Sequence, residues 1–150
     1  MHRPLRVMRF VVLGVFFDAL SCGGGTVAPG SRNGTMGMQP TAPTPLKSDA
    51  GDFLLTIQTD PDPPIRGTNT VTYTVSDASA RSVDGLTLAI VPWMPAHGHG
   101  TSVHPTIVPH GKGVYEIQDV LFFMPGLWEL RSTLTSSVGP DHATPSFTIP

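Results

Sequence analysis

Charged residues are scarce in this chain. Only 13% of its 150 residues are Asp, Glu, Lys or Arg, against roughly 25% in an average soluble domain. This scarcity excludes long coiled coils and highly charged disordered chains. Nine basic and eleven acidic residues give a net charge of −2, so the sequence lacks the basic surface on which nucleic acid depends. We therefore expect no nucleic-acid partner.

Cysteine is almost missing as well. The single cysteine excludes an intrachain disulfide framework and any zinc site built from several thiolates. Glycine and proline, in contrast, are abundant, with 16 of each. Both disfavour helices, and together they favour many short strands joined by turns.

Motifs for catalysis are also lacking. The sequence has no Gly-x-Ser-x-Gly nucleophile motif and no phosphate-binding loop. Glu116 and Glu129 could form a catalytic carboxylate pair, but they lie on separate predicted strands. We interpret them as residues of a solvated sheet face. Ser102, His104 and Asp119 include the residue types of a catalytic triad, but such triples occur by chance in any chain. We predict that the protein is not an enzyme.

The first 21 residues have the pattern of a secretory signal. Arg3, Arg6 and Arg9 precede the apolar run 10–17, and small residues follow it. A basic segment, a short apolar segment and a small-residue cleavage region define such a signal. The apolar run is too short to span a bilayer, which needs about 20 residues.

The only cysteine lies where cleavage is expected. Residues 19–22, Ala-Leu-Ser-Cys, resemble a bacterial lipobox, whose cysteine is lipid-modified and becomes the mature N-terminus. Asp18 before the box and Ala19 in place of the usual leucine depart from that pattern. The alternatives are an ordinary signal peptide cut nearby, or a start codon upstream of a free cysteine. We predict a lipoprotein anchored to the membrane through Cys22, in the periplasm-facing cell envelope or the outer membrane.

A tether and then one β domain follow. Residues 22–50 are rich in Gly, Pro and Thr and show no apolar periodicity, which predicts a flexible, disordered spacer. Beyond it, alternating and β-branched runs separated by turn residues predict strands. About seven strands within residues 53–150 are typical of an immunoglobulin-like β-sandwich, the all-β fold that we expect here. The strands are predicted at residues 53–59, 70–76, 86–93, 104–108, 113–122, 127–134 and 145–149.

Histidines gather in one segment after the third predicted strand. His97 and His99 are two residues apart, and in an extended segment they point the same way, so that two imidazoles can share a metal ion. Met94 and Met124 are candidate thioether ligands. Imidazole and thioether donors suit copper better than calcium or magnesium. Zinc needs a third histidine or a carboxylate, and His104 is the candidate.

A structural explanation of the same residues stays open. Gly98 and Gly100 allow the chain to turn, and histidines in such turns cap backbone groups at sheet ends. Met94 and Met124 then fill irregular gaps in the core. His110 and His142 are predicted to be exposed loop residues in either case.

Four short motifs, taken in their order along the chain, resemble the pattern of a known family. They are Gly67-x-Asn69, Met94-Pro-x-His97-Gly-His-Gly100, Gly113-Val-Tyr115 and Phe123-Met-Pro-Gly-x-Trp128. Their order resembles the YtkA-like domain family, related to the periplasmic portion of FixH proteins, over residues 53–149. The resemblance implies a small extracytoplasmic β-sandwich whose relatives occur near copper handling and respiratory oxidase maturation. Family members often have a second methionine and a glycine before the His-Gly, and here Ala96 and His97 take those places, which enriches the turn in imidazole.

Two functions are therefore predicted. In the first, an anchored extracytoplasmic domain binds or delivers copper through Met94, His97, His99, His104 and Met124. Its partner is then a copper-handling or respiratory-oxidase-related envelope protein. In the alternative, the chain is a non-metal interaction or scaffold module of the cell envelope, and its histidines are structural.

Overall fold

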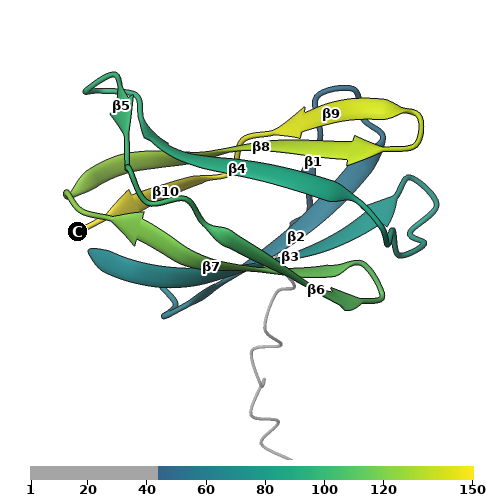
Figure 1. The fold of residues 1–150 in the computed structure, drawn as a ribbon, viewed down its shortest axis with the longest axis horizontal. Coiled ribbons are helices and arrows are strands. Elements are labelled where there is room, and N and C mark those ends of the chain that lie inside the picture. Colours follow the sequence, from purple (N-terminus) through teal and green to yellow (C-terminus); the bar gives the residue numbers. More distant parts are fainter. Residues whose placement is uncertain (1–43) are drawn as a thin grey trace, which may run out of the picture. The chain divides into compact units, whose positions relative to one another are not determined.

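The computed structural model describes residues 44–150, which form ten strands. The predicted signal peptide, Cys22 and most of the predicted tether lie outside the described residues. The strands form two antiparallel sheets that pack face to face (Figure 1). Residues 44–150 contain no helix able to cross a membrane.

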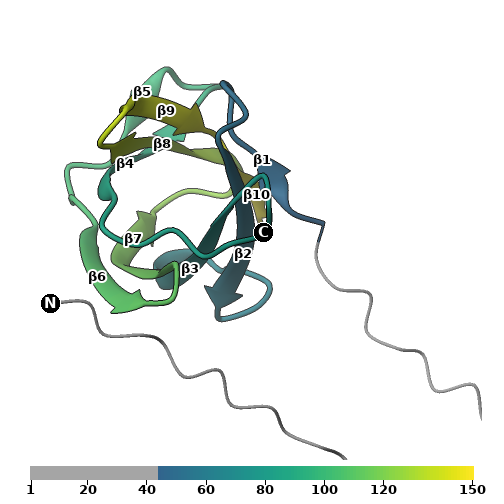
Figure 2. The ribbon, with the colours of Figure 1, turned by 90° about the vertical axis from the view of Figure 1, so that its right-hand side faces the viewer.

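The order of the strands defines the two layers, which Figure 2 shows end-on. The first sheet has the order β1 (Leu46–Lys47), β2 (Phe53–Asp60), β3 (Gly67–Asp77), β7 (Val114–Phe122) and β6 (Thr106–Gly111). The second has the order β10 (Ser146–Ile149), β8 (Gly126–Ser136), β4 (Thr87–Met94) and β5 (His99–Gly100), and β9 (Gly139–Ala143) also pairs with β8.

Alternation along the strands places the core between the sheets. Val71, Tyr73 and Val75 of β3 are fully buried, and the threonines between them are not. The second sheet contributes Trp128 and Leu130 of β8, which are also fully buried. The predicted all-β sandwich is confirmed, while the immunoglobulin-like topology within that class stays a prediction.

Three short strands were not predicted, because two to five residues carry too little periodicity to be recognised. One of them, β1, pairs with β2 at Leu46 and Leu55. Ser48, just after β1, is 3% exposed. The ordered domain therefore begins before Phe53 and includes residues that the sequence assigned to the tether. The other two are β5 and β9. Both sheets and their core are built from residues 44–150, so this fragment contains a complete core.

Buried polar groups tie the layers together. The hydroxyl groups of Tyr73 and Ser132 lie 3.0 Å apart across the sandwich. The Tyr115 hydroxyl donates to the Val83 carbonyl and accepts from the Leu86 N–H, at 3.0 and 3.1 Å. These two bonds fix the crossing from the first sheet to β4. Within the described part of the chain, no buried side-chain nitrogen or oxygen lacks a hydrogen-bond partner.

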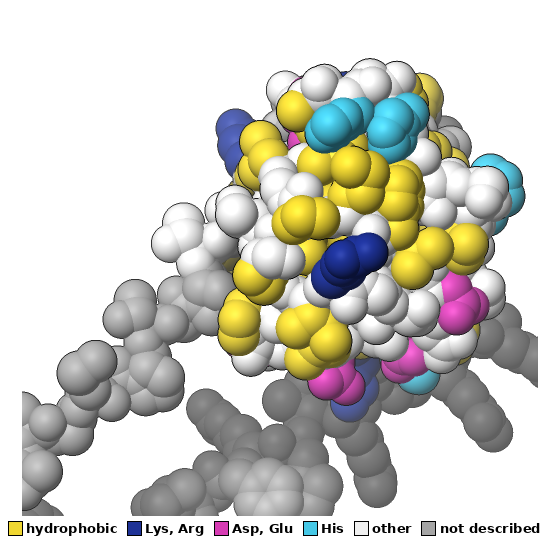
Figure 3. All heavy atoms as spheres, turned by 90° about the vertical axis from the view of Figure 1, so that its left-hand side faces the viewer, with side chains coloured by type: hydrophobic (Ala, Val, Ile, Leu, Met, Phe, Trp, Pro, Cys, Tyr) yellow, Lys and Arg dark blue, Asp and Glu magenta, His cyan; other side chains and the backbone are white. Residues whose placement is uncertain are grey.

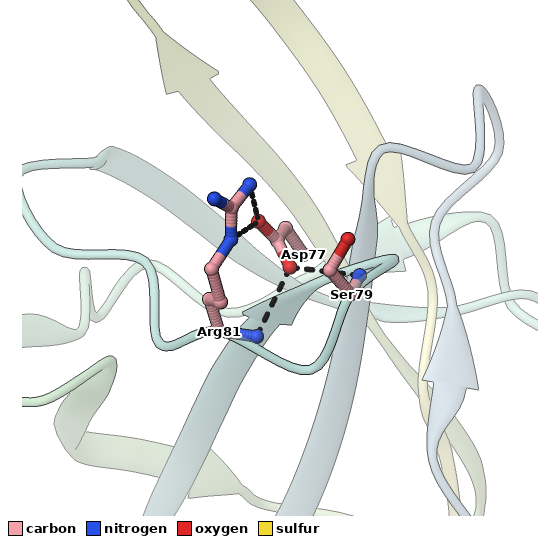
Figure 4. A network of polar contacts seen from close by, with 3 residues as sticks. All are labelled: Asp77, Ser79 and Arg81. Atoms are coloured by element: carbon pink, nitrogen blue, oxygen red, sulfur yellow. Dashed lines mark hydrogen bonds and ion pairs between the residues drawn. The ribbon is translucent and has the colours of Figure 1, made fainter.

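Asp77 organises the exposed turn after β3 (Figure 4). Its Oδ1 accepts hydrogen bonds from the N–H groups of Ser79 and Arg81, at 2.8 and 3.0 Å. Its Oδ2 pairs with Nη2 of Arg81 at 2.8 Å. The hydrogen bonds from Arg81 and Ser79 hold the pKa of the Asp77 carboxyl below its ordinary value. Local polar contacts thus close this turn at little cost to the core.

Candidate functional site

The histidine segment is a tight turn that joins β4 to β5. The N–H groups of His97 and Gly98 both donate to the Met94 carbonyl, at 3.2 and 3.0 Å. Gly98 has a φ of 67°, a left-handed conformation that glycine adopts without strain. Residues 95–98 form a turn closed by these hydrogen bonds, and only His99 lies on a strand. The expectation that residues 97–99 are extended was therefore wrong for His97 and Gly98.

The turn nevertheless brings the two imidazoles together. The ring centroids of His97 and His99 are 5.7 Å apart, with an angle of 44° between the planes, and both residues are exposed. Because a metal lies about 2.0–2.1 Å from a ligating nitrogen, two rings on one ion have centroids roughly 5–6 Å apart. The separation of the two rings therefore lies in the range found for two imidazoles on one metal ion.

An aromatic contact holds His99 in place. Its ring stacks on Phe123 at 5.7 Å with 18° between the planes, and Phe123 meets Trp128 edge-on at 5.2 Å. His99 Nδ1 lies 3.4 Å from the Gly100 carbonyl oxygen. A proton on Nδ1 leaves the Nε2 lone pair free for a metal. Sequence analysis placed Phe123 in a family motif but did not select it as a site residue.

The two candidate methionines lie in the body of the domain. Met94, at the end of β4, is 3% exposed. Met124 is partly buried and packs against the core. Its carbonyl accepts a hydrogen bond from the Trp128 indole at 2.9 Å, which fixes the turn between β7 and β8. Both thioethers thus have packing partners, as the structural explanation expects.

The remaining histidines lie apart from this pair. His104 is exposed in the loop before β6. His110 and His142 are exposed, as predicted, but both lie on strands, β6 and β9, rather than in loops. Their partners are Glu116 at 3.0 Å and Thr133 at 3.2 Å. Among residues 44–150 there is no cluster of three His, Cys, Asp or Glu placed to hold a metal ion.

A shallow hollow opens elsewhere, on the outer face of the second sheet. Trp93, Arg131 and His142 contribute to its lining. The Arg131 guanidinium lies 4.6 Å from the centre of the Trp93 ring, and its Nε donates to Glu129 at 3.1 Å. None of the predicted site residues lines this hollow. The predicted histidine pair is not part of it, and Arg131 belongs to its wall.

Chemically, the segment between β4 and β5 offers two imidazole side chains at the surface, one of them stacked on an aromatic ring. Such donors suit a transition metal of the copper or zinc type rather than a hard oxygen-seeking cation.

Comparisons with known proteins locate the chain in a family. No curated protein matches it, and no solved structure does. The family model described as YtkA-like matches residues 47–133, a span that runs from β1 into β8 and includes the histidine turn. Since the match covers more than half of the 150 residues, the chain belongs to the YtkA-like family.

Proposed function

We propose that this protein is a membrane-anchored extracytoplasmic β-sandwich that binds or delivers copper through the turn between β4 and β5. One observation carries the proposal: the exposed rings of His97 and His99, with centroids 5.7 Å apart. Two surface imidazoles at this separation are near enough to share one dication.

The two imidazoles form the centre of the proposed ligand set. Both belong to one short, hydrogen-bonded turn, so ordering them for a metal costs little conformational entropy. Met94, Met124 and His104, the other ligands predicted from the sequence, are not required by this proposal. The thioethers would have to leave their present packing to bind an ion, and His104 belongs to a separate loop.

The proposed location follows from the N-terminal sequence. The signal-like residues 1–21 and the lipobox-like Cys22 support export and anchoring, although they lie outside the described residues. Several acyl chains make such anchoring stable, where a single chain is marginal. A copper-handling or respiratory-oxidase-related envelope protein is the partner that we propose, in line with the suggested relation to FixH proteins.

Copper titration tests the proposal directly. The fragment 44–150, which lacks Cys22 and its competing thiol, is titrated with Cu(II), and with Cu(I) under reductant. We expect the double variant His97→Ala/His99→Ala to lose at least tenfold in Cu(II) affinity. The matched control His110→Ala/His142→Ala removes two exposed histidines elsewhere and should bind as the wild type does. Equal copper retention by both double variants would exclude the proposed site.

The second candidate is a non-metal interaction module with structural histidines. The stacking of His99 on Phe123 favours it, because that contact gives the imidazole a packing role. On this hypothesis, His99→Ala lowers the melting temperature while the fragment retains no copper. On the copper hypothesis, His97→Ala lowers copper affinity with little change in melting temperature, since His97 is exposed and stacks on no core aromatic residue among those described.

A further inference from the structure

The turn between β4 and β5 presents half of a metal site. His97 and His99 are its exposed donors, and within the described residues no third His, Cys, Asp or Glu completes a cluster with them. Met94 is 3% exposed. Closed zinc sites use four ligands, and Cu(II) with nitrogen donors favours four in a tetragonal arrangement. One chain therefore supplies two of four positions.

The turn is placed where a second molecule can reach it. It projects at one end of the sandwich, at the upper left of Figure 1. Figure 3 views this end and shows two adjacent histidine side chains beside a patch of hydrophobic side chains. Phe123, which stacks on His99, is partly buried and packs against the core beneath the imidazole. A surface of this kind is suited to burial against a copy of itself.

Charge makes such an association depend on the metal. Residues 44–150 carry five Lys and Arg against ten Asp and Glu, so two metal-free copies repel each other. A dication bound between the two turns supplies the attraction that the metal-free domains lack.

We propose that one copper ion bridges two copies of this chain through His97 and His99 of each, giving a four-imidazole site on a two-fold axis. The contact is isologous, because the same turn of each copy meets its counterpart. This inference rests on the proposed function and deepens it: the metal-bound state is a dimer, and the metal-free state is a monomer.

Sedimentation velocity of the fragment 44–150 tests this inference, with Cu(II) alone as the probe and the bound copper measured in each species. We expect the mass to double on addition of Cu(II), with one ion per two chains, and to return to that of the monomer with a chelator. The variant His97→Ala/His99→Ala should stay monomeric. The control His110→Ala/His142→Ala should dimerise as the wild type does.

Other outcomes overturn the bridge in distinguishable ways. One ion per monomer, without a change in mass, would refute the dimer and leave the proposed copper function standing. A copper-induced dimer that persists in His97→Ala/His99→Ala would place the contact elsewhere and also refute it. If the wild type bound no copper, the proposed function and the bridge would fail together.

Discussion

Gly100 packs against the backbone of Pro92 so closely that a Cβ atom at Gly100 would lie 2.5 Å from the Pro92 carbonyl oxygen. Gly100 follows His99 directly and pairs with Trp93 in the ladder between β4 and β5. This close approach keeps β5 against β4 and thereby holds the His99 ring on Phe123. A backbone atom cannot move aside as a flexible side chain can.

We predict that Gly100→Ala destabilises the domain by about 1–3 kcal/mol, the usual cost of overpacking, and lowers Cu(II) affinity because His99 is displaced. Gly111→Ala is the control, since its φ of 76° brings strain but no atom lies near its added Cβ. It should lower stability without changing copper affinity. Thermal melts and copper titration of both variants measure the effects. Unchanged copper binding in a destabilised Gly100→Ala would contradict this account of how His99 is held.

The buried hydroxyl groups of Tyr73 and Ser132 predict that removing one costs less stability than removing the other. Removing the Tyr73 hydroxyl leaves the Ser132 hydroxyl donating to the Leu130 carbonyl at 3.0 Å. Tyr73→Phe should therefore cost about 0.5–1.5 kcal/mol. Ser132→Ala leaves the Tyr73 hydroxyl buried without that partner and should cost about 1–3 kcal/mol. Denaturant unfolding of both single variants and the double variant measures the coupling, and strictly additive losses would argue against it.

The environment of the Asp141 carboxyl predicts how the stability of the fold changes at low pH. Burial by itself raises the pKa of this carboxyl, but hydrogen bonds from the Ser48 side chain and from the N–H groups of Ala50, His142 and Asp52 outweigh it, so the pKa lies below its ordinary value. A lowered pKa means that the carboxylate stabilises the fold above about pH 4. That contribution is lost as the pH falls through the folded-state pKa.

We predict that Asp141→Asn lowers stability at pH 7 by about 1–3 kcal/mol, because an amide cannot accept all of these bonds. The variant should also show a weaker loss of stability between pH 4 and pH 2 than the wild type. Asp49→Asn, on an exposed residue of the same loop, is the matched control and should keep the wild-type slope. Denaturant midpoints measured across this pH range decide the matter.

A substitution at Met94 can distinguish a packing role of this side chain from a role as a copper ligand. Its Cε would lie 2.7 Å from a Cβ at Gly126, so the side chain fills the space that this glycine leaves. Met94→Leu conserves volume and should cost less than about 1.5 kcal/mol, with Cu(II) affinity changed less than twofold. A tenfold drop in copper affinity at unchanged stability would instead establish Met94 as a ligand.

Copper affinity should also depend on pH. Protons compete with the metal for imidazole nitrogens as the solution becomes acidic. We expect the fragment to bind Cu(II) more weakly at pH 5 than at pH 8, because each ligating imidazole can take up a proton instead of the metal. Titrations at pH 8, 7, 6 and 5 measure the slope. An affinity that stays flat from pH 8 to pH 5 would point away from His97 and His99.

The fold was largely predictable because the long strands carry a strict alternation. Val71, Tyr73 and Val75 are apolar on one face of β3, and all three are buried in the core. The strands β1, β5 and β9 were not predictable, since each is a short segment whose pairing depends on a longer neighbour. The pairing of Leu46 with Leu55 is set by the edge of β2, and no pattern within residues 44–50 encodes it.

The sequence by itself determined the class of the domain, its place in the YtkA-like family and the presence of two histidines in a glycine-containing turn. Only the tertiary structure decided which candidate donors are together. The stacking of His99 on Phe123 and the burial of Met94 arise where the turn between β4 and β5 meets the turn between β7 and β8. Contacts between segments about 25 residues apart depend on how the sheet brings them side by side, and periodicity within either segment carries no record of that approach.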